Sequence, residues 1–398
     1  MSSRWPEWVT AHMEEYLPRV RAYDPFPYDQ PGDTSGYITL HENDYLRLSK
    51  HPEVLKARHE ADIRAGGALM ASMVFGGDAG EHAAFTAAIA DSMKTESAVL
   101  TTAGWTANVG ILEALVPKDT PVYLDFAVHG SLWDGSRLSQ GKPVAIRHND
   151  PEKLKSRIEK FGPGIVCLDG IYSGDGSIPD LKRYVEICEQ YNCLLILDEA
   201  HSFGMVGERG GGLAVKLGLE DRIPLKTVSM SKALGQNGGF IAGPKELIWY
   251  LTYRMRSIIF SSSPAPGNSA AGAAGIRILQ REPERAQRCL EMGEYFRKLL
   301  LDRNISPGES QSQIVSLMFK SDPVGAKFYG LMRKRGILVS IFTVPAVPKD
   351  TSLARFSIHC QITRSDMEKV ANATAESLRE LGVDLSPKEA MASVEASG

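Results

Sequence analysis

The sequence predicts an α/β protein with a mostly parallel central sheet and a smaller C-terminal α+β domain. Between residues 96 and 245, short β-rich runs alternate with amphipathic or glycine-bounded stretches, the pattern of βαβ units. The runs are 97–101, 122–124, 144–146, 165–168, 194–197, 227–229 and 239–242. Continuous apolar runs such as 193–197 suit strands that are covered on both faces. Because ligands of such folds bind at the carboxyl ends of the strands, we expect the functional site there.

The length of 398 residues predicts two lobes, because one hydrophobic core usually stops growing at roughly 250–300 residues. A Ser- and Pro-rich segment at 261–266 is followed by a long helical stretch, about 270–303, which we interpret as a connector. Beyond it, residues 313–382 mix predicted strands (314–319, 355–359) with predicted helices (324–335, 364–381). We therefore predict an N-terminal segment 1–45, a large domain 46–270 that holds the site, a small domain 271–386 and a disordered tail 387–398.

Composition and charge exclude several classes of function. Apolar residues make up 43% of the chain, charged residues 23%, and the formal charge is −3, so no basic surface is expected for nucleic acid. The first residues lack an apolar signal region and no run reaches about 18 apolar residues, which predicts a cytoplasmic protein without a membrane span. The five cysteines form no CxxC pair, so neither a disulfide framework nor a metal site is expected.

Two motifs carry the chemistry. Asp198 ends a predicted strand in the motif Asp-Glu-Ala-His, and Lys232 follows another strand in a serine- and glycine-rich setting. A glycine-rich stretch at 207–212 lies between them. A carboxylate and a lysine at neighbouring strand ends suit a cofactor that needs an amine for its aldehyde and a carboxylate for its pyridinium nitrogen.

Asp-Glu-Ala-His is also the nucleotide-hydrolysing box of helicases. That alternative requires a phosphate-binding loop of the form GxxxxGK[ST]. The chain has one Gly-Lys pair, at Gly141, and there Ser136 stands where the first glycine belongs and Pro143 follows the lysine. The helicase interpretation is therefore rejected.

The chain resembles the α-oxoamine synthases, which are fold-type I pyridoxal-phosphate enzymes, over about residues 40–380. Six ordered blocks carry the resemblance: 43–46 (NDYL), 104–108 (GWTAN), Asp125 with 129–135 (HGSLWDG), 169–173 (DGIYS) with Gly176, 198–204 (DEAHSFG), and 229–235 (SMSKALG) with Gly238 and Gly239. Within the family, the amino-acid sequence of segments 104–110, 123–126 and 162–165 is most similar to that of synthases of long-chain α-hydroxyketone quorum-sensing autoinducers. The resemblance implies the aspartate-aminotransferase-like fold and pyridoxal 5'-phosphate as cofactor.

One segment departs from the family pattern. Many relatives carry an arginine in a glycine-rich segment before the cofactor lobe, whereas this chain has Ala-Ser-Met-Val-Phe-Gly-Gly at 71–77. Any substrate role of that arginine is therefore not expected here.

The resemblance implies a role for each group around the cofactor ring. Lys232 would hold the cofactor as a Schiff base and then remove the Cα proton of the substrate, and Asp198 would hold the protonated ring nitrogen. His201 would reach the ring hydroxyl, with Ser173 beside it. His129 would stack on the ring and contact the substrate carboxylate or thioester carbonyl. The structural alternatives are a solvated loop lysine, a helix-capping aspartate and core histidines.

The phosphate and the substrate would meet a second set of residues. The backbone N–H groups of Gly104 and Trp105, at a turn that opens a helix, form an anion cradle to which Ser229 adds a hydroxyl. By resemblance, Ser262 reaches the phosphate of a neighbouring subunit, which implies a homodimer with shared sites. Arg355 would grip the amino-acid carboxylate and Asn43 would line the same pocket. The roles of Ser262, Arg355 and Asn43 rest on the resemblance. The structural alternatives are a Ser-Pro turn at Ser262 and an exposed strand arginine at Arg355.

The implied reaction is a decarboxylating condensation of an amino acid with an acyl-CoA, giving an α-aminoketone. Alternatives within the family are synthases of 8-amino-7-oxononanoate, 2-amino-3-ketobutyrate or a sphingoid base. An aminotransferase of the same fold, which would regenerate an amine form of the cofactor and need no CoA, stays open, as does an idle binding module, since fold alone does not decide chemistry.

Overall fold

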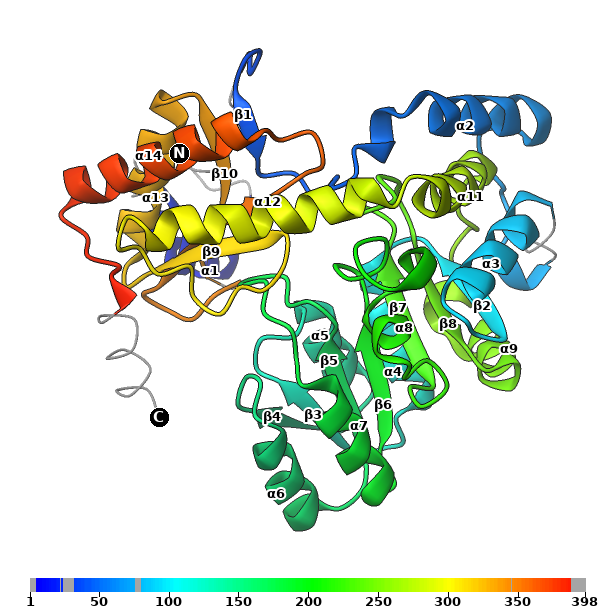
Figure 1. Cartoon of the computed structure of the whole chain (residues 1–398). Helices are drawn as coiled ribbons and strands as arrows, with labels where there is room; N and C mark the ends of the chain where they lie inside the picture. Colours follow the sequence, from blue (N-terminus) through cyan, green and yellow to red (C-terminus); the bar gives the residue numbers. More distant parts are fainter. Residues whose placement is uncertain (1–4, 22, 24–31, 76–79, 345, 388–398) are drawn as a thin grey trace.

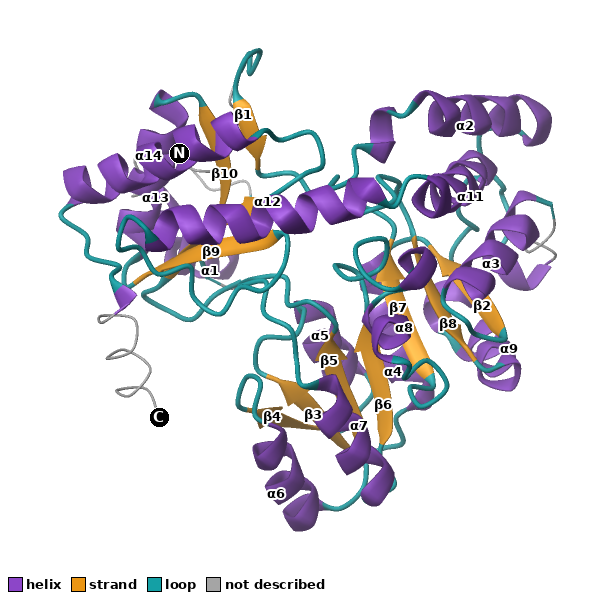
Figure 2. Ribbon diagram, viewed as in Figure 1, coloured by secondary structure: helices purple, strands orange, loops and turns teal. Residues whose placement is uncertain are grey.

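The computed structural model describes residues 5–21, 23, 32–75, 80–344 and 346–387 (Figure 1). The predicted tail therefore lies outside the described residues apart from Pro387. The chain builds two sheets, each with its own set of helices (Figure 2). Within the described part of the chain, no helix combines the length and the apolar character that crossing a membrane would need.

The larger sheet has seven strands in the order β2-β8-β7-β6-β5-β3-β4. Their bounds are β2 Ser97–Thr101, β3 Pro121–Asp125, β4 Lys142–Ile146, β5 Ile165–Asp169, β6 Leu194–Asp198, β7 Leu225–Ser229 and β8 Gly239–Gly243. All pairs are parallel except the two that β8 makes, which are antiparallel. Every residue of β5 and β8 is buried, as expected where both faces are covered. The α/β fold with a mostly parallel sheet and all seven predicted strands are confirmed.

Helices lie on both faces of this sheet (Figure 1). They are α3 Glu81–Ser92, α4 Gly104–Leu115, α5 Gly130–Leu138, α6 Pro151–Phe161, α7 Leu181–Gln190, α8 Leu213–Leu217, α9 Lys245–Arg254 and α10 Arg256–Ile259. Helix α6 illustrates why they form: the Asp150 side chain caps its first turn, Pro151 occupies the first position, and Leu154 and Ile158 bury one face four residues apart.

The smaller sheet has the order β1-β10-β11-β9, with bounds β1 Ile38–Leu40, β9 Ile314–Phe319, β10 Ile337–Phe342 and β11 Ser352–Ser357. Helices α13 Asp322–Lys334 and α14 Arg364–Leu381 pack with it, and α1 Glu7–Arg21 and α2 Pro52–Ala65 precede the large sheet in the chain. The sequence predicts neither β1 nor β10, and the predicted strand at 355–359 begins three residues before and ends two residues before its expected bounds.

The predicted connector is two helices, α11 Pro266–Arg281 and α12 Glu284–Leu301, rather than one. Pro283 separates them because proline has no N–H to donate to the preceding turn. The buried residues of α11 belong to the core of the large lobe, and the core of the small lobe includes Met292 and Phe296 of α12. The hydrophobic cores thus change over within α12, beyond the predicted limit at residue 270, and the domain division itself stays a prediction.

The strand order brings acidic and hydroxyl side chains to one edge of the large sheet. Strands β3, β5, β6 and β7 end in Asp125, Asp169, Asp198 and Ser229, and Asp169 and Asp198 are direct register partners. Since these four strands are adjacent and parallel, their carboxyl ends meet at the same edge.

Candidate active site

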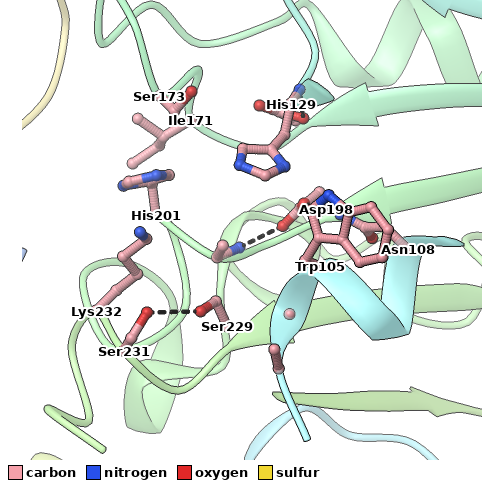
Figure 3. Close-up of a pocket in the computed structure, with 14 residues that line it drawn as sticks. Trp105, Asn108, His129, Ile171, Ser173, Asp198, His201, Ser229, Ser231 and Lys232 are labelled. Atoms are coloured by element: carbon pink, nitrogen blue, oxygen red, sulfur yellow. Dashed lines mark hydrogen bonds between the residues drawn. The ribbon is translucent and has the colours of Figure 1, made fainter. Parts of the chain in front are cut away.

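A cavity of about 250 Å³ opens at this edge (Figure 3). That volume is somewhat below the roughly 300–1,000 Å³ of drug-sized pockets and suits one small substituted ring. Eight of the predicted site residues line it: Gly104, Trp105, His129, Ser173, Asp198, His201, Ser229 and Lys232. Asn43 and Arg355 join through hydrogen bonds, and Ser262 does not reach the cavity of its own chain.

Asp198 lies at the floor of the cavity and is 6% exposed. Its Oδ1 accepts the backbone N–H of Ala200 at 2.9 Å, and its Oδ2 accepts Nδ2 of Asn108, on α4, at 2.6 Å. A carboxylate oxygen can accept two hydrogen bonds, and each oxygen of Asp198 accepts one from the residues named here. Capacity therefore remains for an N–H donor in the cavity. The sequence placed Asn108 in a family block but assigned it no role.

Lys232 points into the cavity from the turn after β7 (Figure 3). Burial, together with the positive charge of Arg355, lowers the pKa of its amine to about 8, against the opposing effect of Asp198. Among the described residues no acceptor forms a hydrogen bond or ion pair with the amine. A partly neutral, unengaged lysine is available as a nucleophile and as a base near pH 8.

His201 lies next to Lys232 and is held neutral. Burial, with the nearby charges of Lys232 and Arg355, lowers the pKa of its ring well below the usual value. Its Nδ1 lies 2.8 Å from the hydroxyl of Tyr45, a residue whose pKa burial raises to about 12. The Gln313 side chain donates to the His201 carbonyl at 2.9 Å. Both supporting residues come from distant parts of the chain, and the sequence did not predict their roles.

The N-terminus of α4 forms the anion end of the cavity. Gly104 and Trp105 begin the helix, so their N–H groups have no partner within it and face the lining beside Ser229. A Cβ on Gly104 would lie 2.6 Å from Cβ of Ser229, so the close approach of helix and strand requires glycine. The Ser229 hydroxyl lies 2.8 Å from that of Ser231.

Arg355, on β11, is a buried cation beside the cavity. Its guanidinium donates to the Ser173 carbonyl at 2.9 Å and to Oδ1 of Asn43 at 2.7 Å. Its Nε is buried and has no hydrogen-bond partner, and within the described residues no carboxylate pairs with it. A buried, unpaired guanidinium favours an incoming carboxylate, because leaving the charge uncompensated is costly. Ser173 thus lines the cavity and also holds the Arg355 guanidinium through its backbone carbonyl.

These groups fit pyridoxal phosphate. The orphan N–H groups at the start of α4 suit the phosphate, and the free acceptor capacity of Asp198 suits a protonated ring nitrogen. The unengaged amine of Lys232 suits an aldehyde. The cofactor would therefore span the cavity from Gly104 to Lys232.

A partly buried ion cluster outside the cavity joins two of its walls, and the sequence did not predict it. His148 Nδ1 lies 2.8 Å from Asp125 Oδ1, and its Nε2 lies 3.3 Å from Asp175 Oδ2. Asp125 accepts a hydrogen bond from the backbone of the turn that leads to His129. Asp175 does the same in the turn that follows Ser173. Burial opposes the imidazolium, but the two carboxylates outweigh it and raise the pKa of His148 to about 10.

This cluster predicts a pH-dependent contribution to stability. A histidine whose pKa is about 10 when folded, against an ordinary value of 6.5, stabilises the fold fully below pH 6.5, and that stabilisation is lost as the pH rises towards 10. The melting temperature of His148→Gln should therefore fall furthest below wild type at pH 6 and approach it near pH 10. His59→Gln, at an exposed position, is the control. A difference that is constant across this range would contradict a charged His148.

Comparisons with known proteins agree with the geometry. The model of the aminotransferase class I and II family matches residues 35–373. The chain is 31% identical to the 8-amino-7-oxononanoate synthase of Symbiobacterium thermophilum, covering 87% of this chain and 89% of that protein. It is 30% identical to a serine palmitoyltransferase of Sphingobacterium spiritivorum (82% and 82%) and 29% identical to the CAI-1 autoinducer synthase of Vibrio campbellii (86% and 86%).

Solved structures are similar as well. A serine palmitoyltransferase of S. paucimobilis with a bound PLP-myriocin aldimine superposes with a TM-score of 0.83 at 27% identity, covering 87% of this chain and 88% of the other. Another serine palmitoyltransferase structure, with PLP, gives a TM-score of 0.85 at 27% identity over 94% of this chain and 98% of the other. The predicted cofactor and enzyme class are thereby confirmed. The chain belongs to the aminotransferase class I and II family and, within it, to the α-oxoamine synthases, which are pyridoxal-phosphate-dependent acyltransferases.

Proposed function

We propose that the protein condenses an amino acid with a medium- or long-chain acyl-CoA, releasing carbon dioxide and CoA and giving an α-aminoketone, as in autoinducer synthesis. The observation that carries the proposal is the buried, unpaired guanidinium of Arg355 beside the free amine of Lys232. An amino acid offers a carboxylate to the first and a Cα proton to the second.

The chain's own residues divide the work. Pyridoxal phosphate, when bound, supplies a sink for the electron pair left at the substrate Cα. Asp198 holds a proton at the ring nitrogen, and Lys232 takes the proton from Cα. Arg355 holds the substrate carboxylate with its planar fork, and Asn43 orients that fork at 2.7 Å. The N–H groups of Gly104 and Trp105 hold the phosphate.

An aminotransferase is the alternative from another class of reaction. It would use the same groups at the cofactor but would leave an amine form of the cofactor after one amino acid is consumed, and it would need no CoA. Mass spectrometry of products after incubation with mixed amino acids and acyl-CoAs separates the two, because only the condensation joins acyl carbon to the amino-acid Cα.

The family relatives support a homodimer, and we propose that the chain forms one with shared active sites. Exposed apolar side chains gather on elements that pack against one another: Phe75, Trp249, Tyr253 and Phe260 are 78%, 64%, 54% and 76% exposed. Exposed patches of this kind mark protein interfaces. Ser262, exposed next to this patch, would reach the partner's phosphate. Sedimentation should give one species of twice the chain mass, and a fully active monomer would contradict the proposal.

The first prediction concerns Lys232. Lys232→Ala should lose the visible absorbance of the bound cofactor, the covalent link that borohydride traps, and product formation, because among the described residues it removes the one lysine amine that lines the cavity. Lys216→Ala, an exposed position on α8, is the matched control and should keep all three. Full condensation activity in Lys232→Ala would end the assignment.

The second prediction concerns the acyl chain. Residues 71–75 contain no basic side chain to pair with a terminal carboxylate, and a buried unpaired charge is costly. Met73 packs in the core of the large lobe and Val74 packs against it. Phe75, at the exposed end of the short helix Met73–Phe75 and within the proposed dimer interface, is therefore the apolar side chain of this segment left for an acyl chain that enters along that interface. Catalytic efficiency should rise from acetyl-CoA towards long saturated acyl-CoAs by at most about fourfold per buried methylene, and a dicarboxylic acyl-CoA should be poor.

A variant pair sharpens this test. Phe75→Ala should flatten the dependence on chain length, whereas Phe161→Ala should not. Phe161 is also exposed but ends α6, just before β5 begins and thus at the opposite edge of the sheet from the cavity. A preference for acetyl-CoA or for a dicarboxylic acyl-CoA in the wild type would exclude the autoinducer branch and leave the Lys232 chemistry intact.

A further inference from the structure

A buried hydrogen-bond chain runs from Asp198 to His129 through two residues without an assigned role. Asn108 Nδ2 donates to Asp198 Oδ2 at 2.6 Å and to Ser131 Oγ at 2.9 Å. Ser131 Oγ lies 2.7 Å from His129 Nδ1. Asn108 is 2% exposed and Ser131 is fully buried, so water does not compete for these bonds. The two groups that would face the cofactor's ring nitrogen and the ring's face are therefore connected.

The direction of the first bond is fixed by its partners. An ionised carboxylate only accepts hydrogen bonds, so the Asn108 amide must turn its NH₂ group towards Asp198. The opposite orientation would place two acceptor oxygens 2.6 Å apart. The Asn108 oxygen then faces Thr227, whose hydroxyl donates to it at 2.6 Å and is itself 1% exposed. The amide thus has both NH₂ hydrogens available, one for Asp198 and one for Ser131.

The orientation of Asn108 also fixes the direction of the bond between Ser131 and His129. The Ser131 oxygen accepts from Asn108, so its single hydrogen is free for His129 Nδ1. The backbone N–H of Ser131 also donates to the same ring nitrogen, at 3.3 Å. A nitrogen that accepts from two donors carries no proton. The proton of the neutral ring is therefore on Nε2, and Figure 3 shows the His129 ring at the wall of the cavity, above Asp198.

We propose that Asn108 and Ser131 are positioning residues that hold His129 as an Nε2–H donor directed at a substrate oxygen, a carboxylate or a thioester carbonyl. The inference rests on the proposed function for the identity of that oxygen, but not for the orientation of the histidine. This series of hydrogen bonds couples the negative charge of Asp198 to the donor character of His129. Reversing the Asn108 amide would break its bonds to Asp198, Ser131 and Thr227, and turning the Ser131 hydroxyl away would break its bond to His129. A histidine fixed in this way stabilises negative charge that develops on the oxygen.

The orientation can be read without turnover. Nitrogen-15 NMR of histidine-labelled, cofactor-free protein distinguishes a protonated ring nitrogen from an unprotonated one, and His129→Gln identifies the relevant signals. The wild type should show Nδ1 unprotonated and Nε2 protonated. Ser131→Ala removes the hydroxyl donor at 2.7 Å and leaves only the longer backbone contact at 3.3 Å, so it should populate the other tautomer in part, and Asn108→Ala should do the same. Ser136→Ala is the matched control, because Ser136 is a buried serine on the same helix whose hydroxyl has no partner.

Kinetics of the cofactor-loaded protein supply the second readout. Ser131→Ala should keep its cofactor affinity and lose about two- to tenfold in kcat/KM for the amino acid, the range for one hydrogen bond, whereas Ser136→Ala should match the wild type. A protonated Nδ1 in the wild type, or a Ser131→Ala protein that equals Ser136→Ala in both tautomer and kcat/KM, would overturn the proposal. Absence of any aminoketone product from the wild type would instead refute the proposed function, and the NMR result would still decide the orientation of His129.

Discussion

The carboxylate of Asp198, buried at the end of β6, is the interaction on which the rest of the site depends. It accepts hydrogen bonds from Asn108 on α4 and from the backbone N–H of Ala200, so a helix and the turn after β6 are tied to one group. Its neighbour Asp169, one strand away, is just as buried, and burial together with the charge of Asp198 raises the pKa of Asp169 well above its usual value. Burial and the charge of Asp198 therefore disfavour a second negative charge at these strand ends.

Around the Asp198 carboxylate, the other groups of the site are predominantly cationic or neutral. Arg355 is buried without a carboxylate, and its charge helps to lower the pKa of both Lys232 and His201. The arrangement has a cost, because a buried guanidinium is favourable only when an anion joins it. The same arrangement makes the site prefer anionic ligands, because a substrate carboxylate and a cofactor phosphate both supply negative charge that compensates the cationic groups. Burial first, and then the charge of Arg355, thus keep the amine of Lys232 partly neutral and reactive.

The sequence predicted what depends on local pattern and missed what depends on distant contacts. Apolar runs located all seven strands of the large sheet, and the clearest runs belong to central strands such as β5 and β6, which are covered on both faces. Strand β1 is three residues long and pairs with β10, about 300 residues away in the chain, so no local signal marks it. Asn108, Tyr45 and His148 were missed as functional groups for the same reason: each acts through a partner that the fold, and not the sequence order, brings near. Ser262 cannot be placed from one chain.

The most direct test of the account replaces Asp198 by asparagine, which keeps the shape and removes the charge that the ring nitrogen and Asn108 both require. The measurement is the condensation rate of the cofactor-loaded variant beside that of Asp169→Asn, because burial and the charge of Asp198 raise the pKa of the Asp169 carboxyl and disfavour its charged form. We predict a loss of several orders of magnitude for Asp198→Asn with the fold retained, and a much smaller loss for Asp169→Asn. Near-normal turnover in Asp198→Asn, or equal losses in the two variants, would contradict the central role of the Asp198 charge.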